Sequence, residues 1–313
     1  MKLLISRALP DSIMVAARDR FDVTCRDTTA PMDLAECRAA LADHDVILPT
    51  LGDAFTSGAF TGPIRARGLA NFGVGYNHID VAAARAAGLV VTNTPGAVTD
   101  ATADTAMTLI LMAARRAGEG ERMVRAGLWE GWHPVQMLGM HVSGKTVGII
   151  GMGRIGQAIA RRCAAGFGMQ VVFWNRSPKA VADARQLATV AQVCAAADIV
   201  VTAVAATPQT RHVIDATALA AMQPHAILVN IARGDVVDEA ALIDALQSGR
   251  IGGAGLDVYE REPIVPDALR ALENVVLLPH LGTAALEVRE DMGRMALDNA
   301  IAIAEGRTPP NPV

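Results

Sequence analysis

Three polar residues in the last third of the chain have the side chains needed to reduce a carbonyl group beside a carboxylate. Arg233, Glu262 and His280 each come soon after a short apolar run. A hydride arriving at a carbonyl carbon leaves charge on the oxygen, and histidine titrates in the right range to protonate that oxygen. A neighbouring carboxylate stabilises the imidazolium and fixes the ring. An arginine can hold the substrate carboxylate and polarise the carbonyl.

Each of these residues also has a simpler interpretation when it is taken alone. A histidine that follows a proline, as His280 does, is more often structural. The glutamate in the run Glu260-Arg261-Glu262-Pro263 could be a solvated loop charge, and Arg233 beside Asp235 could form a surface ion pair. The three act together only if the fold brings them to one place.

A glycine-rich loop earlier in the chain predicts a dinucleotide site. The run Gly151-Met152-Gly153-Arg154-Ile155-Gly156 follows an apolar run and opens an Ala/Ile-rich helical segment. In this context the first glycine permits a tight turn, the second lets a pyrophosphate approach the backbone, and the third lets helix and strand pack closely. The alternative is an ordinary glycine turn. The expected cofactor contacts are Gly151, Gly153, Arg154, Ile155 and Gly156.

The residues after the next apolar run favour NADP(H) over NAD(H). A site for NAD usually has Asp or Glu about 20 residues after the fingerprint, where it bonds the ribose 2′-OH. Asn175, Arg176 and Ser177 stand there instead, so no carboxylate repels a 2′-phosphate. Arg176 can offer a charged fork, while Asn175 and Ser177 can donate neutral hydrogen bonds. NAD(H) remains possible if Arg176 is only a solvated surface residue.

The elements that must position these residues alternate between strand and helix. Short apolar runs separated by Ala-rich segments of helical period indicate a parallel sheet covered on both faces. The pattern restarts after Gly144, which predicts an α/β fold of two doubly wound, Rossmann-like domains. Ligands of such sheets bind beyond the carboxyl ends of the strands, so the three polar residues can reach one crevice. The predicted strands are 2–6, 23–27, 46–50, 70–74 and 89–92, then 146–150, 171–175, 199–204, 226–230, 253–258 and 275–278, and a long helix is predicted over 100–116.

Composition excludes several classes of protein. The chain has 313 residues, of which 51% are hydrophobic and 19% charged, so it can bury a core. A net charge of −4 argues against nucleic acid binding. The apolar helical run 105–114 is too short to cross a membrane, which needs about 20 residues.

The histidines form no metal-ligand pair, so no metal is expected. None of the four cysteines stands at Cys-x-x-Cys spacing, which favours a reduced, cytoplasmic protein.

Five motifs that follow one another along the chain carry a family resemblance. They are Val74–Asp80 (VGYNHID), Thr92–Gly96 (TNTPG), Asn230–Gly234 (NIARG), Gly255–Pro263 (GLDVYEREP) and Leu278–Gly282 (LPHLG). They closely resemble the signatures of the D-isomer-specific 2-hydroxyacid dehydrogenases, with a match over roughly residues 45–285. The resemblance implies that Arg233, Glu262 and His280 are catalytic, that Val74 and Gly75 bind the substrate carboxylate through backbone N–H groups, and that Ile231 and Asp257 contact the cofactor.

The same resemblance implies an architecture. Residues 1–95 and 286–313 are expected to form a flavodoxin-like substrate domain that the C-terminal helix completes, and residues 96–285 a dinucleotide-binding Rossmann domain. Members are usually homodimers built on the inter-domain helix and on an arm, here the segment 127–144.

Within the family, Asn175-Arg176-Ser177 is similar to the NADPH-preferring glyoxylate and hydroxypyruvate reductases. The arm is similar too, and its Trp132 could line the substrate pocket of a partner subunit or simply pack in the interface. Leu51, in a short loop of the first domain, is expected to line the substrate pocket. These features imply NADPH-dependent reduction of small 2-keto acids to D-2-hydroxy acids.

Two alternatives remain open at this point. The same fold could act on another 2-keto acid, such as phenylpyruvate or a branched-chain keto acid. It could also be a binding protein that senses NAD(H), as in the corepressor branch of the family, which keeps the same three polar residues. A turnover assay with NADPH and glyoxylate separates the two classes.

Overall fold

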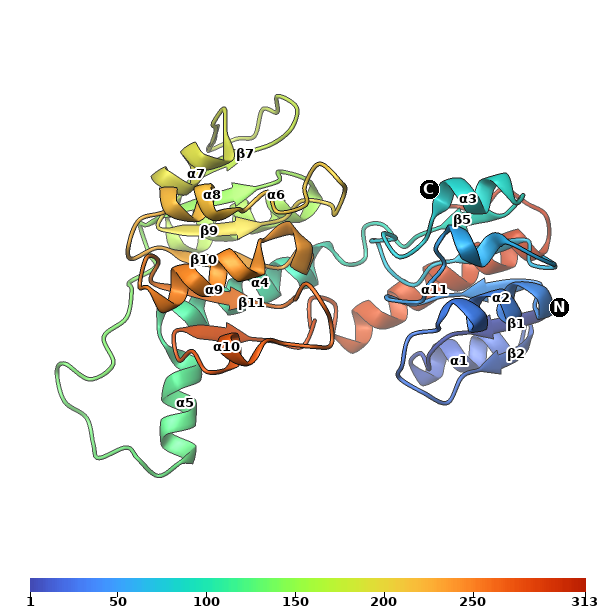
Figure 1. Cartoon of the computed structure of the whole chain (residues 1–313), viewed down its shortest axis with the longest axis horizontal. Coiled ribbons are helices and arrows are strands. Elements are labelled where there is room, and N and C mark those ends of the chain that lie inside the picture. Colours follow the sequence, from blue (N-terminus) through green and yellow to red (C-terminus); the bar gives the residue numbers. More distant parts are fainter. The chain divides into compact units, whose positions relative to one another are not determined.

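The computed structural model describes all 313 residues and divides them into two compact units. The first unit consists of Met1–Val98 and Thr283–Val313, and the second of Thr99–Gly282. Each unit is built on its own parallel sheet, which confirms the prediction of two doubly wound domains (Figure 1).

The first unit has five short strands and helices that cover them. Its elements are β1 (Lys2–Ile5), α1 (Asp11–Arg18), β2 (Asp22–Cys25), α2 (Leu34–Asp43), β3 (Val46–Leu48), η1 (Ser57–Phe60), β4 (Gly68–Ala70), α3 (Val81–Ala86), β5 (Val90–Thr92) and α11 (Leu286–Ala304). The strand order β2-β1-β3-β4-β5 is that of flavodoxin-like folds, as predicted. The C-terminal helix α11 packs against β3 and β4 and so completes this unit.

The second unit has seven strands. Its elements are α4 (Thr99–Ala114), α5 (Ala117–Arg125), β6 (Thr146–Ile150), α6 (Arg154–Phe167), β7 (Gln170–Trp174), β8 (Ala184–Gln186), α7 (Val190–Ala196), β9 (Ile199–Thr202), α8 (Ala216–Ala221), β10 (Ile227–Asn230), η2 (Gly234–Val236), α9 (Glu239–Gln247), β11 (Gly253–Leu256), α10 (Asp267–Arg270) and β12 (Val275–Leu277). The strand order is β12-β11-β10-β9-β6-β7-β8. From β6 the chain first adds strands on one side and then, from β9 on, on the other side, and ligands of such sheets bind at this switch point.

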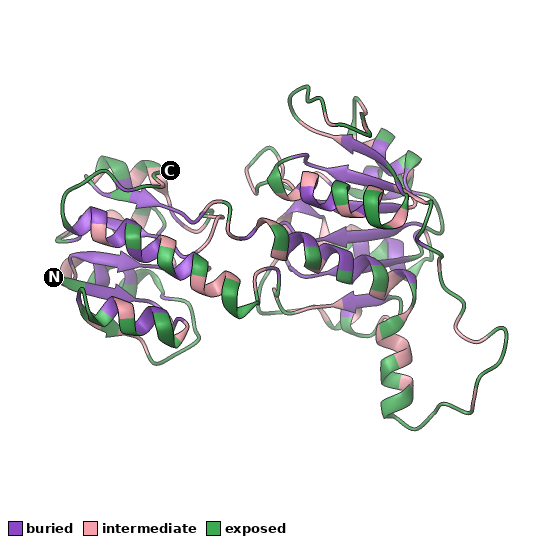
Figure 2. Ribbon diagram, turned by 180° about the vertical axis from the view of Figure 1, so that it is seen from behind, coloured by how far each residue is buried: buried purple, intermediate pink, exposed green.

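The sequence forms these elements for simple reasons. The central strands β9 and β10 are buried along their whole length, which is why they are continuous apolar runs (Figure 2). Five helices, α2, α3, α7, α8 and α9, begin where a side-chain oxygen accepts an otherwise free N–H of the first turn. These capping residues are Asp33, Asp80, Thr189, Asp215 and Asp238.

The long helix α4 differs from expectation in what it exposes. An inter-domain helix that builds a dimer should present apolar side chains to a partner subunit, but Ile110 is 0% and Met107 8% exposed. The reason is that α4 packs against α6, β10 and β11 of its own unit. Only Leu111, at 36%, remains an exposed large apolar side chain on this helix.

Exposed apolar side chains gather instead on α5 and the segment after it. Helix α5 buries none of its residues, and residues 126–145 contain no helix or strand. The segment 127–144, the predicted arm, projects together with α5 from the second unit (Figures 1 and 2). Its exposed apolar residues are Leu128, Trp129, Trp132, Val135 and Leu138. No helix of the chain is both long and apolar enough to cross a membrane.

Two strands differ from the sequence prediction. The strand expected over 70–74 lies at Gly68–Ala70, because the Asn71 side chain bonds the carbonyl oxygens of Gly73 and Gly75 and draws the following residues into a loop. Strand β8 is not predicted by the sequence, because this edge strand has two partly buried residues around the exposed Arg185 and carries no apolar pattern.

Candidate active site

The three predicted catalytic residues follow the carboxyl ends of neighbouring strands in the second unit. Arg233 comes after β10, Glu262 after β11 and His280 after β12. Nδ1 of His280 lies 2.8 Å from Oε2 of Glu262, and the two side chains are 30% and 29% exposed. This ion pair leaves Nε2 of the imidazole for another partner.

The backbone around Arg233 is fixed by a buried amide and a close approach. Asn230 donates from Nδ2 to the carbonyl oxygen of Arg233 at 2.9 Å, and its Oδ1 accepts from Thr202 and from the N–H of Ala232. A Cβ on Gly234 would lie 1.8 Å from the carbonyl carbon of Tyr259. Only glycine therefore lets the loop that carries Arg233 press against the segment that leads to Glu262.

The loop that carries His280 is held by Asp257. His280 has φ 56°, a left-handed conformation that costs free energy for a residue with a side chain. The carbonyl oxygen of Asp257 accepts from the N–H of His280, and its carboxylate accepts from the N–H groups of Leu281 and Gly282 at 2.6 and 2.8 Å. Three successive N–H groups are thus bound to one residue at the end of β11.

Burial and neighbouring charges shift the pKa values of Glu262, Arg233 and Asp257. Burial raises the pKa of Glu262, but the hydrogen bond and charge of His280, the N–H of Tyr259 and the charge of Arg233 outweigh burial, so the pKa is lowered overall. Burial lowers the pKa of Arg233, against the opposing effects of Glu262 and Asp235. Burial likewise raises the pKa of Asp257, although its two N–H donors and His280 oppose the shift. Because its pKa is lowered, the Glu262 carboxylate stays ionised and presents a negative charge to Nδ1 of His280.

The glycine loop lies between β6 and α6, at the switch point of the sheet. Gly151 has φ 101°, and a Cβ on Gly156 would lie 2.1 Å from the Gly151 carbonyl oxygen, so conformation and packing require both glycines. A Cβ on Gly153 would meet no atom of the chain within 4 Å. Packing therefore does not require glycine there, whereas a pyrophosphate that approaches the backbone does. Arg154 and Ile155 begin α6 and have N–H groups without intrahelical acceptors, so these residues fit a dinucleotide.

The predicted 2′-phosphate residues follow β7, next to the glycine loop. Oδ1 of Asn175 accepts from the N–H of Met152 at 3.2 Å, which ties the two loops together. Arg176 and Ser177 are exposed. Sequence reasoning missed Lys179, a second exposed cation in this loop, although its place three residues after Arg176 was a visible signal. Ile231 lies buried directly after β10, beside Arg233.

In the first unit, Val74 and Gly75 lie in the loop after β4. Two buried amides hold the carbonyl oxygens of this loop: Asn71 donates to Gly73 and Gly75, and Asn93 to Val74 at 2.9 Å. The N–H groups of Val74 and Gly75 have no acceptor within the chain, so this loop offers donors to an anion. Sequence reasoning did not assign roles to Asn71 and Asn93, yet both are polar residues at the carboxyl ends of strands.

Leu51 lies in the loop after β3, and this loop is rigidly supported. Nη1 of Arg7 donates to the Leu51 carbonyl oxygen at 2.8 Å. The fully buried carboxylate of Asp53 accepts from the N–H groups of Thr50 and Met32. The remaining predicted substrate contact, Trp132, lies in the arm with 79% of its surface exposed.

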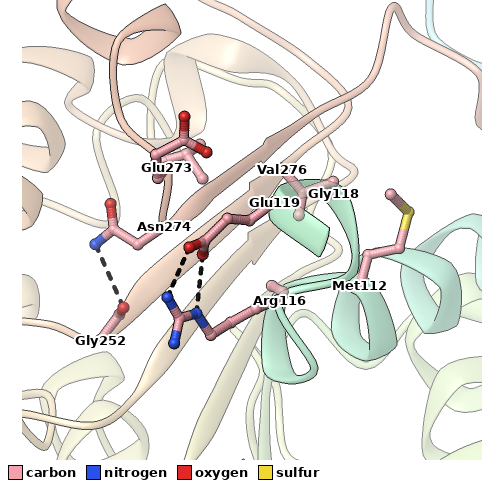
Figure 3. Close-up of a pocket in the computed structure, with 10 residues that line it drawn as sticks. Met112, Arg116, Gly118, Glu119, Gly252, Glu273, Asn274 and Val276 are labelled. Carbon is pink, nitrogen blue, oxygen red and sulfur yellow. Dashed lines mark hydrogen bonds and ion pairs between the residues drawn. The ribbon is translucent and has the colours of Figure 1, made fainter. Parts of the chain in front are cut away.

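A separate hollow of about 400 Å³ lies elsewhere in the second unit (Figure 3). It is lined by the residues that precede β11 and β12, such as Gly252 and Asn274, and by Arg116, which pairs with Glu119. Because the strands are parallel, this hollow lies at the edge of the sheet opposite the catalytic residues. No group of three or more His, Cys, Asp or Glu residues is placed to hold a metal ion.

Known proteins resemble this chain along its whole length. The family model of the NAD-binding domain of D-isomer specific 2-hydroxyacid dehydrogenases matches residues 107–282. A glyoxylate reductase of Thermococcus gammatolerans is 42% identical over 316 residues, which cover 99% of this chain and 94% of that protein.

Solved structures agree in fold. A protein of Thermus thermophilus has a TM-score of 0.94 at 40% identity, with 100% of both chains covered. An NADPH-dependent glyoxylate/hydroxypyruvate reductase of Sinorhizobium meliloti, in complex with NADP and malonate, has a TM-score of 0.90 at 35% identity, with 100% of this chain and 96% of that chain covered.

Proposed function

The chain belongs to the D-isomer-specific 2-hydroxyacid dehydrogenase family, and from that premise we propose that it reduces glyoxylate and hydroxypyruvate to 2-hydroxy acids of D configuration, with NADPH preferred. The observation that carries this proposal is the Glu262–His280 ion pair beside Arg233, since it supplies an acid, its orienting carboxylate and a cation for the carbonyl. The relatives named glyoxylate reductase support the choice of small substrates.

Each residue of the second unit then has a distinct task. The bound nicotinamide supplies the hydride. His280 donates a proton from Nε2 to the carbonyl oxygen, because Glu262 occupies Nδ1. Arg233 binds the substrate and polarises the carbonyl, and an arginine keeps its charge even when burial lowers its pKa. Asp257 keeps the His280 loop in place. We propose that Asp257 also contacts the nicotinamide and that Ile231 contacts the cofactor.

Residues 1–95 and 286–313 are proposed to form the substrate domain. The N–H groups of Val74 and Gly75 would receive the substrate carboxylate, since their neighbouring carbonyl oxygens are already engaged by Asn71 and Asn93. Leu51 would line the substrate pocket from its supported loop.

We further propose a cytoplasmic homodimer. The arm exposes five large apolar side chains within eleven residues, from Leu128 to Leu138, more than a monomer usually leaves in water. A partner subunit would cover them, and Trp132 would either reach the partner's substrate pocket or pack in the interface. The four free cysteines, three of them buried, suit a reducing compartment.

The preference for NADPH rests on Arg176 and on the lack of a carboxylate at 175–177. We expect kcat/KM with glyoxylate to be higher for NADPH than for NADH. Arg176→Ala should lower kcat/KM for NADPH by about tenfold, as expected for the loss of a charged hydrogen bond, and hardly change NADH use. A wild-type enzyme that prefers NADH would contradict this part of the proposal.

A panel of 2-keto acids assayed with both cofactors tests the activity itself. Glyoxylate and hydroxypyruvate should be reduced with higher kcat/KM than phenylpyruvate and branched-chain keto acids. A preference for the larger acids would overturn the substrate assignment. Tight nucleotide binding with no turnover of any keto acid would instead favour a protein that senses NAD(H).

A further inference from the structure

One side chain of the edge strand β8 ties together the loop proposed to hold the 2′-phosphate. Nε2 of Gln186 donates to the carbonyl oxygens of Asn175 and Ser177, at 3.1 and 3.2 Å. Its Oε1 accepts from the N–H of Lys179 at 2.8 Å. A single amide thus binds three backbone positions that flank Arg176.

This loop has few other constraints. Residues 175–183 connect β7 to β8, two parallel neighbours, in nine residues and without a helix. Connections between parallel strands usually need a dozen residues or more and contain a helix that fixes them. Apart from Gln186, Asn175 is the side chain that holds the start of the loop, through Met152, the Ser177 carbonyl oxygen and the Ser177 hydroxyl.

The charges of the loop are suited to an anion. The side chains of Arg176 and Lys179 are exposed and form no hydrogen bond or ion pair within the chain. Arg185 adds a third cation, and Asp183 is the only acid between residues 175 and 186. The carbonyl oxygens of this loop would repel a phosphate, and Gln186 engages two of them.

We infer that Gln186 is a positioning residue that sets the selectivity for the 2′-phosphate. Its amide fixes the backbone on both sides of Arg176, so that Arg176, Ser177 and Lys179 are arranged before the ligand arrives. Ordering these side chains in advance lowers the entropy lost on binding. The inference rests on the proposed preference for NADPH and adds the residue that controls it.

The test compares two ligands that differ only in the 2′-phosphate. Binding of adenosine 2′,5′-bisphosphate and of adenosine 5′-monophosphate is measured by calorimetry on the full-length protein. Gln186→Leu removes three hydrogen bonds and keeps a side chain of similar size. It should weaken the bisphosphate by about tenfold and the monophosphate by less than about twofold.

A second variant, Gln186→Glu, and a matched control, Gln192→Leu, complete the test. Gln186→Glu keeps the acceptor for Lys179 but loses both donated bonds and adds negative charge, so it should lose more selectivity than Gln186→Leu. Gln192 bonds the N–H of Ala188 through the same kind of amide but does not touch the loop, so Gln192→Leu should leave both affinities unchanged.

The possible results distinguish the role of Gln186 from the proposed preference for NADPH. Equal losses for both ligands, or no loss for either, in the Gln186 variants would overturn the role of Gln186 while leaving the NADPH preference intact. Equal affinities of the wild-type protein for the two ligands would overturn the preference itself. A thermal melt of each variant, measured separately, shows whether it is folded before the affinities are compared.

Discussion

Replacing Glu262 by glutamine should move the alkaline limb of the reduction-direction kcat/KM profile to lower pH. In the proposed mechanism the proton donor is protonated His280, so activity should fall as pH rises and this form is lost. Glu262 stabilises the imidazolium through its charge, and glutamine can still accept a hydrogen bond from Nδ1. The variant therefore removes the charge and keeps a bond, and the enzyme should remain active under more acidic conditions.

The size of the shift follows from the separation of the two charges. Glu262 Oε2 and His280 Nδ1 are 2.8 Å apart, with side chains 29% and 30% exposed. Opposite charges about 4 Å apart attract by about 1 kcal/mol in water and about 4 kcal/mol near a protein surface. Because solvent reaches both side chains, the attraction between them should lie toward the lower end of this range. The loss of an attraction of this size should move the limb toward acid.

The assay is the initial rate of glyoxylate reduction at limiting glyoxylate and saturating cofactor, measured across a pH series. Glu260→Gln is the matched control, since Glu260 lies in the same segment and pairs with His212 rather than His280. It should leave the limb where it is. A profile of Glu262→Gln that coincides with the wild type would refute the pairing, and Asp257 would then be the next acid to consider.

The remaining predictions concern the other catalytic residues and the assembly. His280→Ala should lower kcat/KM by on the order of 10²-fold or more, because the proton donor is lost. Arg233→Ala should raise KM steeply as well as lower kcat, and an unchanged KM would show that this residue does not bind substrate. Light scattering at micromolar concentration should give a dimer rather than a single 32.7 kDa chain, and Leu128→Asp with Val135→Asp should shift the equilibrium toward monomer. A wild-type protein that scatters as a monomer would rule out the arm as an interface.

The strands were predictable where burial dominates. The strand predicted over 146–150 has its observed bounds, and the neighbouring strands agree within a few residues, because fully buried parallel strands are continuous apolar segments. β8 was not predicted, because a short edge strand with no fully buried residue has no such signal. The sequence could not show what covers α4, since an apolar helix has the same pattern whether its own unit or a partner subunit covers it.

The sequence identified the candidate residues of the site but not the residues that hold their loops in place. Motifs identified Arg233, Glu262 and His280, and parallel topology explained why they could meet. Asn230, which holds the Arg233 loop, lies in a motif that did not show its supporting role. Gln186, which holds the loop proposed for the 2′-phosphate, lies in no motif. Their roles depend on backbone groups that become neighbours only after the chain has folded.

Asp257 and His280 show how two unfavourable features can stabilise each other. A non-glycine residue in the left-handed region costs about 1 to 3 kcal/mol, and a buried carboxylate without partners costs several. Here the carbonyl oxygen and the carboxylate of Asp257 bind the N–H groups of His280, Leu281 and Gly282, so the carboxylate gains donors and the strained loop gains a fixed acceptor. The backbone that carries the imidazole is thereby held in place, and Glu262 binds the ring itself. Neither motif alone contains this information, because the aspartate looks like a strand-end acid and the histidine like a loop residue until the two are brought together.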